Sequence, residues 1–316
     1  MHLLAAYPDR VLALDDGTLS TEFEGDVQCI DDGPQGVYVG TSDGVYRRQE
    51  AGQWAPVAAV GDVTSVTVAE SGVWVGTEPS AVYHAPEGSD FSQCAPLDDL
   101  PSSDDWAFPP RPSTHHVRWL EWTPERLYAA VEAGALLRSE DGGESWLDRV
   151  PTGPRDTHSM ATHPERPEVA CAAAGDGCYV TEDGGDTWQT AEAGLDRTYC
   201  WSVVCDPADP DALLLSAAFG ARSAHTFETA DSAVFRREAG DDEWTRCEGL
   251  PGPEGLLRAE LAPTGEPRGA VAATNHGLFR TDDWGASWER MPGDWPPALA
   301  DAAPRGVVVR RTRRRS

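Results

Sequence analysis

Ser139-Glu140-Asp141-Gly142-Gly143-Glu144-Ser145-Trp146 is the stretch of sequence that decides the fold. The same order of a hydroxyl residue, an Asp, a Gly and a Trp returns at 181–188 and 281–288. Each of these three octets lies between two short apolar runs, which predicts the turn of a β-hairpin. Recurrence of one hairpin along the chain indicates a repeat architecture.

The residue types of the octets explain such a turn. The Asp carboxylate and the Ser or Thr hydroxyl accept neighbouring backbone N–H groups, and Gly supplies a positive φ. The Trp ring then packs between sheets, where it buries a large apolar area. The residues to which we assign this structural role are Ser139, Asp141, Gly143, Trp146, Thr181, Asp183, Gly185, Trp188, Thr281, Asp283, Gly285 and Trp288.

The hairpins belong to a longer repeat of four short strands, roughly 40 to 55 residues long, which is the period of a propeller blade. Turns rich in Pro precede the second strand, as in 163–167 before 169–173 and in 206–210 before 212–215. The complete blades are expected at 26–60, 61–97, 115–153, 154–194, 195–250 and 251–292.

The two ends of the chain complete the pattern. Residues 1–25 contain three strand-like runs but no first strand, and the β-branched run Gly306–Arg310 can supply it. A shared closing blade leaves no exposed sheet edge. We therefore predict an all-β, seven-bladed β-propeller, a single domain over 1–316 whose closing blade combines about 1–25 with 303–311, followed by a basic tail at 312–316.

Composition limits the function classes. The chain of 316 residues has 53 acidic and 25 basic residues, a net charge of −28 and no lysine. This balance indicates a halophilic protein with an acidic surface, and it disfavours nucleic-acid binding. A specific basic partner and bulk Ca²⁺ binding are the alternatives.

The sequence also predicts where the protein works. The N-terminus has no basic and apolar signal-peptide pattern, and no run has the length of a membrane span. The seven cysteines are odd in number and scattered, which favours reduced thiols. We expect a cytoplasmic monomer.

The octets resemble the Asp-box, or BNR, repeats. Their compact form is most similar to photosystem II stability/assembly factor-like proteins and to prokaryotic BNR proteins of haloarchaeal type, within an architecture shared by sialidases, xyloglucan-cleaving glycoside hydrolases and sortilin-like receptors. The resemblance implies that the Asp-box is structural and lies on the face opposite the ligand-binding face, so the octet aspartates receive no catalytic role. The arginine set and Tyr–Glu pair of a sialidase are not recognisable in the sequence.

Two insertions, 98–114 and 219–230, are expected on the face away from the octets, where long loops on a rigid scaffold usually bind ligands. They can equally be tolerated surface insertions.

Aligning the first strands on the prolines that follow them places Arg118, His158 and Trp201 at equivalent positions along the central channel. The full set of ligand-binding candidates at this channel mouth is Arg118, His158, Trp201, His115, His116, Arg222, His225, Arg258 and His276. The alternative is a set of hydrogen-bonded channel residues around ordered water.

We expect no metal ion and no cofactor, because the histidines lack metal-motif spacing and would have to come from distant blades. The arginines of 310–315 form a docking arm for an acidic partner or a solvated terminus. The sequence therefore favours a non-enzymatic scaffold that binds a protein or a small ligand through the face with the insertions. A glycoside hydrolase with its site at the same mouth is the alternative, although two carboxylates at a suitable distance occur by chance among so many.

Overall fold

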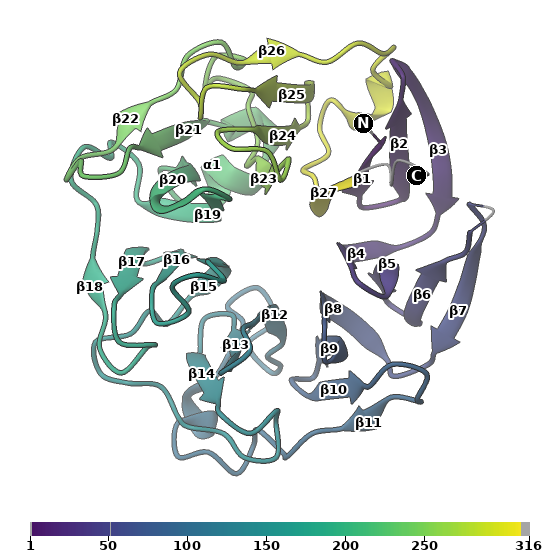
Figure 1. The fold of residues 1–316 in the computed structure, drawn as a ribbon, viewed down its shortest axis with the longest axis vertical. Coiled ribbons are helices and arrows are strands. Elements are labelled where there is room, and N and C mark those ends of the chain that lie inside the picture. Colours follow the sequence, from purple (N-terminus) through teal and green to yellow (C-terminus); the bar gives the residue numbers. More distant parts are fainter. Residues whose placement is uncertain (1, 51, 311–316) are drawn as a thin grey trace. The chain divides into compact units, whose positions relative to one another are not determined.

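The computed structural model describes residues 2–50 and 52–310, whose strands form seven antiparallel sheets (Figure 1). The fold is a seven-bladed β-propeller, as predicted. The chain divides into two compact units, which we describe separately: unit 1 comprises Met1–Val27 and Ala193–Ser316, and unit 2 comprises Gln28–Glu192. The basic tail at 312–316 lies outside the described residues.

The closing blade of unit 1 joins the two ends of the described chain. β27 (Gly306–Arg310) pairs antiparallel with β1 (His2–Tyr7), with His2 opposite Arg310 and Ala6 opposite Gly306. β2 (Arg10–Asp15) and β3 (Thr18–Glu24) complete the sheet in the order β27-β1-β2-β3. Apolar residues on both faces of β1 are buried, which explains why the β-branched run of β27 is drawn to this edge. The prediction that both termini share one blade is confirmed.

Two further four-stranded sheets complete unit 1. Their strands are β19 (Tyr199–Asp206), β20 (Asp209–Ala218), β21 (Ser232–Arg237), β22 (Thr245–Arg246), β23 (Glu260–Pro263), β24 (Ala270–Thr274), β25 (Gly277–Thr281) and β26 (Glu289–Arg290). The insertion 219–230 contains α1 (Ala221–His225) and the 3₁₀ helix η2 (Phe227–Thr229), and η3 (Pro297–Leu299) precedes β27. None of the helices in the described ranges is long and apolar enough to cross a membrane.

Unit 2 holds four sheets. Their strands are β4 (Val27–Gly33), β5 (Gly36–Thr41), β6 (Gly44–Arg48), β7 (Trp54–Ala58), β8 (Asp62–Ala69), β9 (Gly72–Glu78), β10 (Val82–Ala85), β11 (Ser92–Gln93), β12 (Val117–Trp122), β13 (Leu127–Val131), β14 (Ala135–Ser139), β15 (Thr157–Thr162), β16 (Ala170–Ala174), β17 (Gly177–Thr181) and β18 (Gln189–Thr190). The insertion 98–114 carries the 3₁₀ helix η1 (Ser103–Asp105).

The third blade departs from the predicted four strands. Its sheet has the order β12-β13-β14, and the fourth strand is reduced to an isolated bridge between Arg138 and Leu147. The chain after Leu147 is held instead by the insertion, because the Asp148 carboxylate accepts hydrogen bonds from the backbone N–H and the hydroxyl of Ser102. The insertion thus replaces part of the fourth strand as the partner of this segment.

The three octets fold alike. In Thr181–Trp188, the Thr181 hydroxyl donates to Asp183 Oδ1 (2.8 Å) and accepts the N–H of Gly185 (3.0 Å), while Asp183 accepts the N–H and hydroxyl of Thr187. These hydrogen bonds, that from the Thr187 hydroxyl above all, hold the pKa of Asp183 at about 2. The octets at 139–146 and 281–288 repeat the same set of bonds.

Each octet Trp packs between its own sheet and the preceding one. Trp146 lies in a cluster with Trp74 of the second blade, and Trp188 lies in one with Tyr128 of the third. Trp288 packs with Leu214 of the fifth blade. The predicted role of the rings, to fill the space between neighbouring sheets, is therefore observed in both units.

Candidate functional site

Arg118, His158 and Trp201 occupy the same place in their strands. In β12, β15 and β19 the register with the second strand shifts by one residue, and the extra residue is Arg118, His158 or Trp201 respectively. A bulge of this kind leaves one residue out of the ladder and re-aims its side chain. The sequence alignment on the following prolines thus located a recurring β-bulge, and the residues that surround the bulged side chain differ between the two units.

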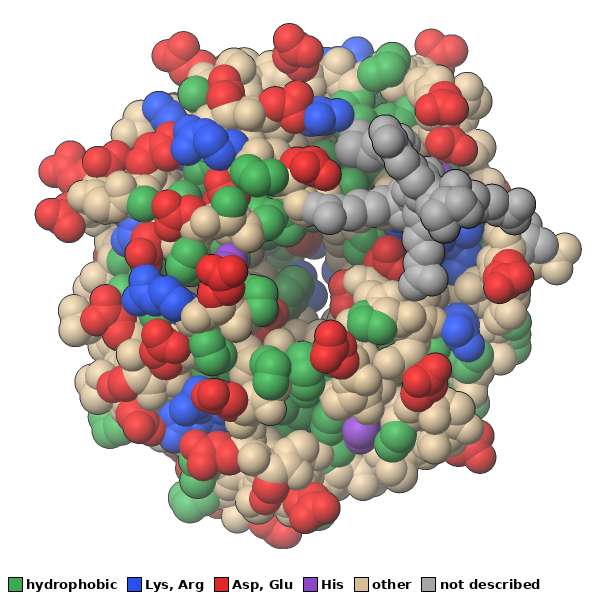
Figure 2. Space-filling model, viewed as in Figure 1, with side chains coloured by type: hydrophobic (Ala, Val, Ile, Leu, Met, Phe, Trp, Pro, Cys, Tyr) green, Lys and Arg blue, Asp and Glu red, His purple; other side chains and the backbone are tan. Residues whose placement is uncertain are grey.

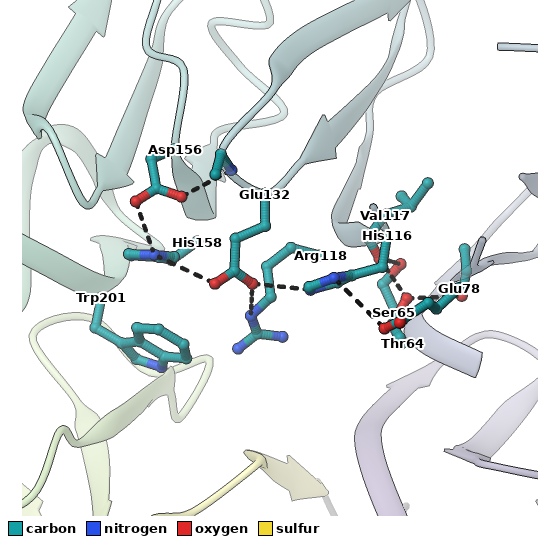
Figure 3. A network of polar contacts seen from close by, with 12 residues as sticks. Thr64, Ser65, Glu78, His116, Val117, Arg118, Glu132, Asp156, His158 and Trp201 are labelled. Carbon is teal, nitrogen blue, oxygen red and sulfur yellow. Dashed lines mark hydrogen bonds and ion pairs between the residues drawn. The ribbon is translucent and has the colours of Figure 1, made fainter. Parts of the chain in front are cut away.

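In unit 2 the bulged residues meet around one carboxylate, in what we call the Glu132 cluster: His116, Arg118, Glu132, Asp156 and His158 (Figure 3). Glu132 lies in the turn between β13 and β14, where its N–H donates to the carbonyl of His116. Its Oε2 accepts a hydrogen bond from His116 Nε2 at 2.9 Å and lies 3.8 Å from Arg118 Nε. His158 Nε2 lies 4.0 Å from Glu132 Oε1 and 3.8 Å from Asp156 Oδ2.

The electrostatics of the two carboxylates differ. Burial opposes ionisation of Glu132, but the hydrogen bond from His116 and the charges of His158 and Arg118 outweigh it and lower its pKa to about 2. Burial raises the pKa of Asp156, and the neighbouring Glu132 charge adds to this effect while His158 opposes it. Glu132 is therefore the anion that holds the cluster together.

The insertion 98–114 is tied to the same cluster. Arg111 makes a two-pronged ion pair with Glu78 at the end of β9, and Glu78 Oε2 lies 3.7 Å from His116 Nδ1. The Phe108 ring packs edge-on against His116 with 4.8 Å between centroids. The loop is therefore positioned by contacts with the blade residues beneath it.

In unit 1 the third bulge builds a different arrangement, which we call the Trp201 cluster: Tyr199, Trp201, His225, Arg258 and Glu260. Glu260 Oε1 accepts hydrogen bonds from Trp201 Nε1 (2.7 Å) and from Arg258 (2.8 Å). The Arg258 guanidinium lies 3.9 Å from the centre of the Trp201 ring, and its Nε donates to His225 Nδ1. Trp201 is 4% exposed and Arg258 is 2% exposed, so these two residues and Glu260 form a buried hydrogen-bonded core, while His225 at its edge is exposed.

The remaining candidates lie at the edges of these clusters. His115 is half-buried and packs edge-on against Trp106, and Arg222 is exposed on α1. His276 follows β24 and lies 2.9 Å from the carbonyl of Gly255 through Nε2. The structure thus groups Arg118, His116 and His158 in unit 2, and Trp201, His225 and Arg258 in unit 1.

The carboxylates at the two centres were not among the sequence candidates. Glu132 and Asp156 stand in loops, and Glu260 begins β23 two residues after Arg258. A usable signal existed for each, namely an acidic residue at the same strand end as a bulged Arg, His or Trp. It was obscured by the abundance of acidic residues in the chain.

Comparisons with known proteins identify fold relatives. No protein-family model matches the chain, and no curated protein matches it in sequence. Among solved structures, an ancestral GH74 enzyme is similar with a TM-score of 0.65 and 16% identity, over 92% of this chain and 40% of that one. YCF48 bound to a D1 peptide is similar with a TM-score of 0.60 and 17% identity, over 85% of this chain and 82% of that one.

A chain of the mitotic checkpoint complex is similar as well, with a TM-score of 0.63 and 13% identity, over 92% of this chain and 86% of that one. At such identities these likenesses show the propeller fold alone. This chain spans less than half the length of the GH74 enzyme. The class defined by fold and site is therefore a β-propeller with polar clusters at the bulges of its first strands.

Proposed function

We propose that this protein is a non-enzymatic scaffold that binds a protein partner through the insertion 219–230. The observation that carries the proposal is the exposure of two aromatic rings on this one insertion. Phe219 is 61% exposed and Phe227 is 42% exposed. Solvent-exposed aromatic side chains often become the buried anchors of protein interfaces.

The insertion is held firmly enough to present these rings. The Arg197 guanidinium stacks over the Phe219 ring at 4.3 Å and is itself paired with Asp196 and Asp231. The carbonyl of Ala224 in α1 accepts the N–H of Arg258 at 3.0 Å. Binding to a loop that is already ordered loses less conformational entropy.

The fold relatives support this class of function without assigning a partner. The YCF48 structure contains a bound D1 peptide, and the checkpoint chain belongs to a protein assembly. The propeller fold therefore occurs in one protein with a bound peptide and in one protein that belongs to a complex. For this chain we propose a protein partner and a halophilic, cytoplasmic setting.

The test replaces Phe227 by a photo-crosslinking benzoylphenylalanine and irradiates the protein in extract of its source cells at molar KCl. We expect a discrete crosslinked partner that is lost when Phe219 is also changed to Ser. The matched control carries the same crosslinker at Leu147, an exposed apolar residue of unit 2 at 47% exposure. Crosslinks that are identical at both positions, or absent at Phe227, overturn the proposal.

A glycoside hydrolase is the second candidate function. It is favoured by the GH74 likeness and by the closeness of Glu132 and Asp156, whose facing oxygens lie within 4.8 Å. Retaining glycosidases hold their two carboxyl groups about 5 Å apart. Screening aryl-glycosides and sialosides in high salt tests it. Turnover that is abolished by Glu132→Gln would favour the glycoside hydrolase over the non-enzymatic scaffold.

A further inference from the structure

Three possible metal ligands of unit 2 converge in the Glu132 cluster. One possible ligand atom each from Glu132, Asp156 and His158 lies within 4.8 Å of the other two, and His158 Nε2 faces Glu132 Oε1 and Asp156 Oδ2. Figure 3 shows both carboxylates directed at the His158 ring, one from the β13–β14 turn and one from the loop before β15. The three residues come from neighbouring blades of one unit, so the histidines of distant blades that the sequence analysis considered are not needed.

The contacts of His158 Nε2 with the two carboxylates are longer than hydrogen bonds and close to the spacing of neighbouring ligands around a metal ion. His158 Nε2 lies 3.8 Å and 4.0 Å from the two carboxylate oxygens, beyond the range of an N–H···O bond. Ligands at about 2.1 Å from a tetrahedral metal ion lie roughly 3.4 Å apart. The two His158 contacts would have to shorten by a few tenths of an ångström to reach this spacing, and the two carboxylate oxygens, which lie within 4.8 Å of each other, by up to about 1.4 Å.

The other oxygen of each carboxylate is already engaged. Glu132 Oε2 accepts from His116 Nε2 at 2.9 Å, and Asp156 Oδ1 accepts the N–H of Ala133 at 2.8 Å. Glu132 is only 9% exposed, and its Oε1 is the oxygen that faces His158 Nε2. Support of one carboxylate oxygen while the other faces inward is the arrangement that orients metal-binding carboxylates in proteins.

We propose that Glu132 Oε1, Asp156 Oδ2 and His158 Nε2 bind one divalent transition-metal ion. An imidazole with two carboxylates suits Zn²⁺, Mn²⁺ or Fe²⁺, whereas Ca²⁺ and Mg²⁺ prefer oxygen ligands alone. The two carboxylates supply two negative charges, which the neighbouring Arg118 only partly offsets. The Asp156 side chain, 28% exposed, gives the ion a route from solvent.

Such an ion would join the β13–β14 turn to the loop before β15, and so tie two neighbouring blades together. The site is built from residues of unit 2, whereas the insertion 219–230 belongs to unit 1, and its test measures metal binding rather than partner capture or turnover. Failure of either proposal therefore leaves the other intact.

The test titrates Zn²⁺ into the full chain after chelation and dialysis, by calorimetry at neutral pH. Asp and Glu side chains are spread over the face seen in Figure 2, so loose cation binding has to be suppressed. About 1 M KCl does this, because the screening length is then about 3 Å. We expect one ion per chain, and an affinity that Asp156→Asn and His158→Gln each lower about ten-fold or more.

His84→Gln and Asp90→Asn are the matched controls, since both residues lie in unit 2 outside the cluster, and they should keep the affinity. The seven cysteines are thiols, so Co²⁺ spectra provide a second measurement, in which thiolate ligands give strong near-ultraviolet bands that N and O ligands lack. Circular dichroism checks folding, and Asp156→Asn alone decides if His158→Gln does not fold. No binding, equal binding by all variants, or a thiolate spectrum overturns the proposal.

Discussion

The Trp201 cluster and the Glu132 cluster are both built on the same kind of β-bulge, but their polar contacts differ. In the Trp201 cluster one carboxylate, Glu260, accepts from both an indole and a guanidinium at 2.7 Å and 2.8 Å. In the Glu132 cluster a fully buried His158 faces two carboxylates at 3.8 Å and 4.0 Å. In the Trp201 cluster direct hydrogen bonds join the carboxylate to both neighbours, whereas in the Glu132 cluster the contacts of His158 with the carboxylates are longer than hydrogen bonds.

Equivalent positions in the repeat thus carry different chemistry in the two clusters. The bulge directs a side chain to a given place, but the neighbouring residues determine which charged groups that side chain faces. The Trp201 cluster, with its direct hydrogen bonds, is expected to contribute to stability, whereas the Glu132 cluster is expected to bind a metal ion. Four measurements test this contrast.

The largest effect is expected from Glu260→Ala. The change leaves the buried Arg258 guanidinium without its carboxylate and removes the partner of Trp201 Nε1. Breaking a buried pair in this way costs about 3 kcal/mol or more of the free energy of unfolding. Urea unfolding followed by circular dichroism measures it.

A double variant serves as the control for that change. Glu260→Leu combined with Arg258→Met removes both charges, and it should recover most of the lost stability, because well-packed apolar residues often replace a buried ion pair without cost. A loss below about 1 kcal/mol for Glu260→Ala would show that the hydrogen bonds of Glu260 contribute little to the stability of the fold.

The second effect concerns a carboxylate that has no cation among its strongest influences. Burial raises the pKa of Asp31 from 3.8 to about 7, although it accepts the Val68 N–H, and the charge of Glu121 adds to the shift. A raised pKa means that the folded state holds the proton longer, so stability falls as pH rises from about 4 to about 7.

Asp31→Asn should remove that part of the decline, which is at most about 1.4 kcal/mol per pH unit for one group. The unfolding curves of wild type and variant should coincide near pH 4 and diverge toward pH 7. Glu121, whose pKa burial also raises to about 7, keeps a residual slope in the variant. Parallel curves over this range would contradict the prediction.

Much of the fold could be predicted from the sequence, because the octets combine local turn chemistry with a buried Trp. Val307 and Val308 indicated a strand, and the missing first strand at the N-terminus indicated its partner. The reduced fourth strand of the third blade could not be predicted, since it depends on Asp148 reaching Ser102 in an insertion of irregular structure.

The candidate site was predictable only in part. The alignment found the bulged Arg118, His158 and Trp201, because strand position follows from the repeat. Their carboxylate partners lie in loops or at a strand end, where spacing along the chain carries little information about spacing in space. Whether any of these residues contacts a ligand stays a prediction.

A smaller effect is expected from Asp156→Asn in chelated protein. The amide oxygen can still accept the Ala133 N–H, and the variant no longer buries a charge there, which outweighs the lost attraction of His158 and adds to the lost repulsion of Glu132. The free energy of unfolding should therefore rise slightly, by less than about 1 kcal/mol. With Zn²⁺ in excess the wild type should have the larger free energy of unfolding, because only the wild type gains metal-binding energy on folding. A large loss in the absence of metal would mean that the Glu132 cluster is a closed network like the Trp201 cluster.

The smallest effect separates buried from exposed charge. Raising KCl from about 0.1 M to about 1 M shortens the screening length from about 10 Å to about 3 Å. If the net charge of −28 reflects a halophilic surface, wild-type stability rises with salt and the chain unfolds as KCl falls below about 1 M. The loss caused by Glu260→Ala should change by less than about 0.5 kcal/mol over the salt range in which the chain stays folded, because a pair shielded from water is screened little. Thermal unfolding of both proteins across the KCl series measures the two quantities together. A wild type insensitive to salt argues against the halophilic surface, and a salt-sensitive difference between the two proteins argues that the Glu260 pair is reached by solvent.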